Sequence, residues 1–376
     1  MQSSENMISR YQMLCLGFLA MLAPIIRLLP QQVVAKSGGF AWLSALIAII
    51  PLTLLYLLVF RFLKYALPGE GFGELFLRAL GKPLGKAAIL LFTLWLMFYA
   101  GFALRTAADR YINSAYENTS PAIFIVIMLL LALIPLLGRF KNLGRTAESF
   151  FPLLILVLAL VFAFAFGDVD LLVLPPPSAA RLPKLLSGVP IVSIVLSLSV
   201  NIGFLEGRIS QKRSRLKTAF IWLFLMLAVA LLLCFEIVGC FGPELSAKLS
   251  YPFFTMVQNI SILGIFERLD PVVLAMWVIA DFILTSTLMF IIVNNLLLLF
   301  GFAPAAAERE KRLSMKNGRW LIWLTAAVIL TLALIMAPDA ESLIRLGHEI
   351  VPLFNLALNY GLLPLIILTG LIRKKV

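Results

Sequence analysis

The chain has 376 residues, of which 62% are hydrophobic and only 13% are charged. Soluble globular proteins have about half apolar and about a quarter charged residues, so this composition excludes a soluble protein, soluble enzymes included. The net charge of +12 does not indicate a nucleic-acid-binding protein, because the Lys and Arg residues lie in short loops where anionic lipid headgroups are the expected counter-charge.

Ten apolar stretches follow one another along the chain, separated by short hydrophilic segments. At a rise of about 1.5 Å per residue, a helix of about 20 residues crosses the roughly 30 Å of hydrocarbon in a bilayer. The sequence therefore predicts an all-α integral membrane protein with ten transmembrane helices in one domain, residues 1–376. The expected spans are 11–34, 41–61, 86–104, 120–137, 147–166, 189–206, 218–238, 271–299, 319–336 and 351–371.

Positive charge is distributed unequally between the two sides of these spans. With the N-terminus in the cytoplasm, 22 of the 31 Lys and Arg residues fall in cytoplasmic segments, eight fall on the opposite side, and Arg27 lies within a span. Arg105 and Arg110 are among the eight, in the segment after the third span. The distribution follows the positive-inside rule and predicts a polytopic inner-membrane protein with both termini in the cytoplasm.

The first span is interrupted by a proline, which cannot donate an amide hydrogen and clashes with the preceding turn. We expect a break at Ala23, Pro24 and Ile25, whose freed backbone groups bind a solute's carboxylate and amine. A plain proline kink is the alternative. Arg27, near the outer end of the same span, either extends its guanidinium to water or acts as a gate above the site.

Spans three and five offer further candidates. Phe98 and Tyr99, with Phe102, either form an aromatic lid over the binding site or serve ordinary packing. Glu148 begins span five three residues after Arg145, a spacing that favours an ion pair at the rim, with a coupling or gating role as the alternative.

Span six has small and polar residues in a row, and we expect it to be discontinuous like span one. Ser197, Ser199, Asn201 and Gly203 are the expected substrate-binding positions; the alternative is serines that bond back to their own helix. Spans one and six each begin a half of five spans, 11–166 and 189–371, which an odd count relates by inverted topology. Paired broken helices in such repeats indicate a binding site at the membrane midplane.

Asp281 lies about 15 Å deep in span eight, where a carboxylate needs a partner, a proton or water. Thr285 falls on the same helical face. We expect either a coupling-ion or proton site with Thr285 as a second oxygen ligand, or a structural Asp capped by hydroxyls of a neighbouring helix.

Motifs for other chemistry are absent from the sequence. There is no HExxH, no GxxxxGK[ST] and no CxxC, so we expect no enzyme, no metal and no cofactor. Cys15, Cys234 and Cys240 are expected to be small core residues. His348, the sole histidine, lies outside the spans and is expected to be solvated.

Three groups of residues resemble the spore-germination permease family, the B subunits of nutrient germinant receptors. They are Tyr251-Pro252-Phe253 with Ile260-Ser261, Phe266-Glu267-Arg268-Leu269-Asp270 and Trp277-Val278-Ile279; Gly144-Arg145-Thr146-Ala147-Glu148 with Phe151-Pro152; and the opening from Ile8-Ser9 to Pro30 with Ala41-Trp42. The resemblance implies the amino acid, polyamine and organocation transporter superfamily, a five-plus-five inverted repeat, and the spore inner membrane. It also implies an A subunit and a lipoprotein C subunit as partners.

Three functions remain open on the sequence alone. The first is the sensing of a nutrient, expected to be an amino acid, as a subunit of a germinant receptor with a transporter-like fold. The second is a proton- or cation-coupled amino acid permease that uses Asp281. The third is an ion-conducting or assembling subunit without a ligand of its own.

Overall fold

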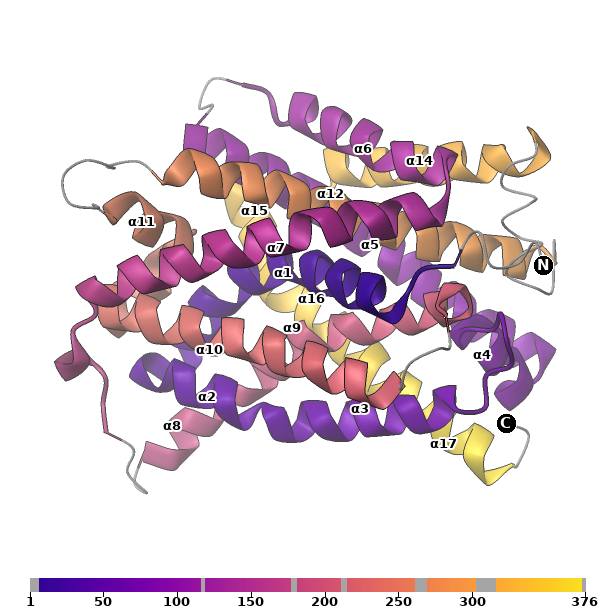
Figure 1. Ribbon diagram of the computed structural model, residues 1–376, viewed down its shortest axis with the longest axis horizontal. Helices are drawn as coiled ribbons and strands as arrows, with labels where there is room; N and C mark the ends of the chain where they lie inside the picture. Colours follow the sequence, from indigo (N-terminus) through magenta and orange to yellow (C-terminus); the bar gives the residue numbers. More distant parts are fainter. Residues whose placement is uncertain are drawn as a thin grey trace.

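The computed structural model describes residues 7–115, 119–176, 181–210, 215–260, 269–301 and 316–373, and within these ranges the protein is a bundle of long helices. Most helices run along one common axis (Figure 1). The first and last described residues lie at the same end of the bundle, which we call the termini end; α8 and α11 lie at the opposite end (Figure 1).

A helical segment covers each of the ten ranges expected from the sequence. The elements are α1 Arg10–Ser37, η2 Gly38–Phe40, α2 Ala41–Ile47, α3 Ile49–Leu63, α4 Phe72–Leu80, α5 Lys82–Ala115, α6 Pro121–Leu137, α7 Phe140–Ala165, α8 Leu182–Leu186, α9 Val189–Ser197, η6 Leu198–Arg208, α10 Arg215–Lys248, α11 Pro252–Asn259, α12 Asp270–Leu299, α14 Lys316–Ile335, α15 Ala340–Arg345, η7 Leu346–Ile350, α16 Val351–Asn355, η8 Leu356–Leu362 and α17 Leu363–Ile372. Short 3₁₀ turns, η3 Phe166–Asp168 and η4 Leu171–Val173, follow α7.

Seven helices of the described ranges are long and apolar enough to cross a membrane, so the chain is an integral membrane protein. One of them, Arg10–Leu63, contains both α1 and the α2–α3 pair, which correspond to two expected spans. Two shorter apolar helices, Pro121–Leu137 and Arg319–Ile335, correspond to two more.

Helix α1 lies at the centre of the bundle and is continuous from Arg10 to Ser37. The prediction of a broken first helix is therefore wrong. Pro24 and Pro30 lie inside the helix, and residues 13–30 are all buried against α10, α12, α7 and α9. Away from water, unwinding would leave several backbone groups unpaired, whereas a proline removes only one hydrogen bond. Close packing on all sides therefore keeps the helix intact.

Span six does change its backbone where the sequence predicts a discontinuity. The α-helix α9 ends at Ser197 and the chain continues as the 3₁₀ helix η6. Ser197, Ser199 and Asn201 each donate a side-chain hydrogen bond to the carbonyl three residues earlier. These bonds compete with the regular i−4 pattern, and Gly203 and Gly207 weaken it further. The polar row therefore tightens the helix.

Helix α5 extends eleven residues beyond the expected span 86–104. Arg105 and Arg110 lie on this helix, 7% and 1% exposed. The prediction that both belong to an external loop is wrong, because residues 105–115 contain no Gly or Pro and the last turns pack against α12 and α6. The extension brings two cations into the bundle.

Candidate functional site

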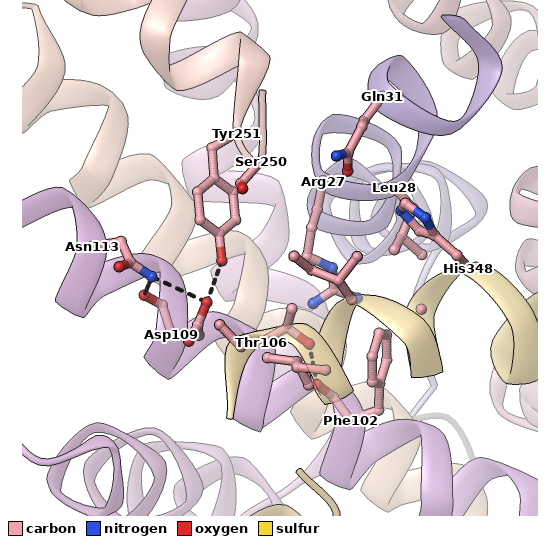
Figure 2. A pocket seen from close by; sticks show the side chains of 14 residues that line it. Arg27, Leu28, Gln31, Phe102, Thr106, Asp109, Asn113, Ser250, Tyr251 and His348 are labelled. Atoms are coloured by element: carbon pink, nitrogen blue, oxygen red, sulfur yellow. Dashed lines mark hydrogen bonds between the residues drawn. The ribbon is translucent and has the colours of Figure 1, made fainter. Parts of the chain in front are cut away.

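A pocket of about 300 Å³ is lined by residues of α1, α5 and α15 and by the segment before α11, the helix that lies at the end of the bundle opposite the termini (Figure 1). Its buried side is formed by α1 and α5, and its rim by the segment before α11 and by α15 with the π-helical turn η7. The volume falls at the lower end of the range for small-molecule sites. The lining residues are Arg27, Leu28, Gln31, Phe102, Thr106, Asp109, Asn113, Ser250, Tyr251, Ala340, Leu343, Ile344, Gly347 and His348 (Figure 2).

Arg27 gives this pocket its chemical character. Its side chain is 6% exposed, and none of its three guanidinium nitrogens has a hydrogen-bond partner among the described residues. The guanidinium lies over the ring of Phe102, 5.0 Å from the centroid, and points into the middle of the pocket (Figure 2). A buried guanidinium without partners is costly, so the pocket favours an anionic group such as a carboxylate.

An acidic group faces the pocket from α5. Asp109 accepts hydrogen bonds from Tyr251 Oη at 2.6 Å and from Asn113 Nδ2 at 3.1 Å, and lies 3.7 Å from Arg105. Figure 2 shows Asp109 and Tyr251 on one side of the pocket and Arg27 beside them. The pocket therefore presents a carboxylate and a guanidinium, from different helices, to the same space.

The rim opposite Asp109 is tied to α1. Gln32 Nε2 donates to the carbonyl of Gly347 at 3.1 Å, and a Cβ on Gly347 would lie 3.2 Å from the ring of Phe102. This close approach holds η7 against the buried side of the pocket. His348 follows on the same turn and is exposed at the rim, which agrees with its predicted solvation.

A second charged group lies inside the bundle near the pocket. Asp281 of α12, 2% exposed, pairs with Arg110 of α5 and accepts a hydrogen bond from Tyr111 Oη at 3.0 Å. The Arg110 guanidinium lies 4.5 Å from the ring centroid of Trp277. The structural alternative is borne out in part, since the Tyr111 hydroxyl of the neighbouring helix α5 caps Asp281 together with the Arg110 guanidinium. Oδ1 of Asp281 has no hydrogen-bond partner among the described residues, and the coupling-ion or proton role stays a prediction. Thr285, also buried, has no hydrogen bond to the pair among the described residues.

The termini end of the bundle is closed. Arg10 at the start of α1 forms a two-pronged ion pair with Glu206 of η6, and both side chains are buried. Ile8 pairs with Ile209 as an isolated parallel bridge, with backbone hydrogen bonds of 3.0 and 2.9 Å. A Cβ on Gly144 of α7 would lie 2.6 Å from Ile8. The start of α1 is thus fixed to both η6 and α7.

The two serines predicted to bind substrate in span six have hydrogen-bond partners within the protein, whereas the side-chain oxygen of Asn201 has none among the described residues. Ser197 also accepts from Asn359 at 3.2 Å, and Ser199 shares a 2.7 Å hydrogen bond with Tyr56 Oη. A Cβ on Gly203 would clash with the ring of Phe72. The cavity beside Ser199 and Gly203 has a volume of about 20 Å³, which holds about one water molecule. An amino acid does not fit there in this conformation.

The other predicted site residues are dispersed. Ala23, Pro24 and Ile25 are buried in contact with neighbouring helices, and none of them lines the pocket. Phe98 stacks on Trp95 at the outside of α5, whereas the Tyr99 side chain is fully buried near the Arg27 guanidinium, so the two do not form one lid. The water-exposed alternative for Arg27 is excluded by its burial.

Glu148 accepts a 2.8 Å hydrogen bond from Gln12 of α1. Within the described residues it makes no ion pair with Arg145, so the predicted rim pair is not formed. Cys15, Cys234 and Cys240 are free, and the first two are buried. No group of three or more metal-ligating side chains occurs in the ranges that the structure describes.

Asp109, Tyr251 and Arg110 are the functional candidates that sequence reasoning missed. The signal for Arg110 was the absence of any helix-breaking residue after 104, and that for Asp109 was its i,i+4 spacing from Arg105. Tyr251 gives no local signal, because its partner is 142 residues away.

Comparison with known proteins adds a decisive observation. The sequence profile of the spore germination protein family, a family of permeases, matches residues 7–341. The chain belongs to this family. The match includes the pocket wall from α1, α5 and Tyr251, and it ends at the start of α15.

The fold is similar to that of a solved crystal structure, MhsT in complex with L-phenylalanine. The TM-score is 0.59 at 14% sequence identity, and the superposition covers 98% of this chain and 99% of MhsT. At this identity the likeness concerns the fold alone. No curated protein matches the chain in a sequence search.

Proposed function

We propose that this protein is the nutrient-binding membrane subunit of a spore germinant receptor, and that the nutrient is a small zwitterion such as an amino acid. The observation that carries the proposal is Arg27, a buried guanidinium without partners that points into a pocket of about 300 Å³. Family membership supports the biological setting, and the MhsT-like fold supports a small solute as ligand.

The chemistry of the pocket favours a zwitterion over a simple anion. Arg27 offers unused donors to a carboxylate, while Asp109 offers an acceptor to an ammonium group. Phe102, Leu343 and Ile344 line the same space and fit an apolar side chain. The ligand's carboxylate therefore balances the positive charge of the Arg27 guanidinium.

The architecture proposed for the membrane is ten crossings in two inverted halves of five. In that arrangement α1, α2–α3, α5, α6 and α7 form the first half, and α9–η6, α10, α12, α14 and α16–α17 form the second. The termini end then faces the cytoplasm, or the spore core, and the pocket opens to the outside. The closed termini end and the hollow opposite end are consistent with a receptor that waits for an external nutrient.

The receptor role means that nutrient binding shifts an equilibrium between conformations, which an A subunit and a lipoprotein C subunit then read. Asp281 does not support the permease alternative, since the charge of this carboxylate is already paired with that of Arg110.

Binding of the twenty proteinogenic amino acids to the purified, detergent-solubilised protein tests this function. We expect at least one to bind, and Arg27→Gln to weaken it by roughly 10- to 100-fold, because a hydrogen bond to a charged group contributes about 1.5–3 kcal/mol. Isothermal titration calorimetry gives both affinities.

Arg345→Gln is the matched control, because Arg345 is an exposed arginine of α15 that pairs with the exposed Glu341. It should bind like the unmodified protein. An Arg27→Gln variant that binds the same amino acid with unchanged affinity would show that the amino acid does not bind in this pocket. Failure of all twenty amino acids to bind would remove the ligand class.

A further inference from the structure

The ion pair between Arg110 and Asp281 lies outside the proposed nutrient site and calls for its own explanation. Asp281 is the kind of buried carboxylate that coupled transporters use to bind a cation. Here the carboxylate oxygen Oδ2 receives both an Arg110 nitrogen and the Tyr111 hydroxyl. At Oδ2, the position in which a free cation would meet Asp281 is occupied by a guanidinium, while Oδ1 has no hydrogen-bond partner among the described residues.

We infer that Arg110 is a built-in cation that takes the place of a free monovalent cation at Asp281, so that the protein needs no sodium, potassium or proton bound there. This inference holds whether or not the pocket binds an amino acid, because it rests on a different pair of helices.

Burial makes the exchange of Arg110 for a mobile ion unfavourable. The two side chains are 1% and 2% exposed, and the guanidinium face is covered by Trp277 and flanked by Tyr111, at 4.5 and 5.3 Å from the ring centroids. A charge held by a side chain of α5 stays with the protein through every conformational change, whereas a bound ion is released. Conformational changes are therefore not linked to an ion gradient through Asp281, since only a ligand that binds two states differently shifts them.

Replacing Arg110 by a neutral residue should leave Asp281 able to bind a free cation. Without Arg110, the Asp281 carboxylate and the Tyr111 hydroxyl remain buried between α5 and α12, and a buried carboxylate in that position needs a small cation or a proton. Of the other charged or titratable groups, Arg27 and Tyr99 interact with Asp281, and Tyr251 with Arg110, at longer range. None of these donates a hydrogen bond to Asp281 in the described structure.

Thermal stability of the whole purified protein tests the inference without a known nutrient. Tm is measured in NaCl, KCl and choline chloride at equal ionic strength, at pH 6 and at pH 8.5. At each pH the unmodified protein should have the same Tm in all three salts. Arg110→Met should lose roughly 5–10 °C in choline chloride at pH 8.5 and recover at least half of that loss in sodium, in potassium or at pH 6.

The double variant Arg110→Met/Asp281→Asn separates a cation site from a general salt effect. With the carboxylate gone, its Tm should change with the cation and with the pH no more than that of the unmodified protein does. Arg345→Met, at the exposed pair of α15, is the control for loss of an arginine elsewhere.

Two results would overturn the inference. One is a folded Arg110→Met protein whose Tm is the same in every salt and at both pH values. The other is a Tm of the unmodified protein that rises with sodium or potassium over choline, which would mean that a free cation already binds. If Arg110→Met does not fold, Arg110→Lys serves instead: it keeps a tethered cation and should be insensitive to sodium, and a sodium-dependent Tm in that variant contradicts the inference.

Discussion

Helix α1 carries two buried arginines whose surroundings differ, and the difference separates the two ends of the molecule. Arg10, at the termini end, is paired in a two-pronged contact with Glu206, beside the Ile8–Ile209 bridge. Arg27, about 26 Å further along the same helix, has no hydrogen-bond partner and faces a pocket. A buried charge that pairs with an opposite charge of the protein, such as Arg10, holds two elements together. A buried charge without such a partner, such as Arg27, is available to a ligand.

The largest expected effect breaks the closed end. Glu206→Gln leaves the buried Arg10 without its carboxylate, which should lower the free energy of unfolding by about 3–5 kcal/mol. Thermal unfolding in detergent measures the loss. The double variant Arg10→Gln/Glu206→Gln should recover most of it, because it removes both charges of the pair.

Glu341→Gln is the control for this comparison, because it breaks an exposed pair that contributes at most about 1 kcal/mol. The reactivity of Cys15, which is fully buried on α1, reports whether the end has opened. We expect a thiol reagent to modify Cys15 faster in Glu206→Gln than in Glu341→Gln. Equal rates would mean that the Arg10–Glu206 pair stabilises the protein without closing it.

The sequence predicted the helices well and the site poorly, for physical reasons. Long apolar stretches fix where helices form, and the polar row in span six correctly indicated a change of backbone at Ser197. The prediction of a break at Pro24 was wrong, because a proline unwinds a helix where the freed backbone groups find new partners. Close packing around α1 leaves no such partners. Arg110 was missed because its partner Asp281 is 171 residues away. Contacts of this kind have no local signal.

A smaller effect sharpens the description of the open end. Asp109→Asn keeps the hydrogen-bonding shape of the side chain but removes its charge, so Tyr251 and Asn113 retain a partner. We expect the affinity for an amino acid to fall about tenfold, and the affinity for the same molecule without its amino group to change less than twofold. Titration of both compounds checks this, and an equal loss for both would mean that Asp109 only shapes the pocket.

The smallest effect concerns the middle of the bundle, between the two ends. Ser199→Ala removes the hydrogen bond to Tyr56 and should lower stability by about 1 kcal/mol. Ser193→Ala, which loses only a bond to its own helix at Val189, is the matched control and should cost less. Because the cavity beside Ser199 holds about one water molecule, we expect amino acid affinity to stay within twofold in both variants. A tenfold loss in Ser199→Ala alone would show that the nutrient binds at the midplane and not in the Arg27 pocket. The contrast between the closed and the open end of α1 would then describe how the nutrient reaches its site rather than the site itself.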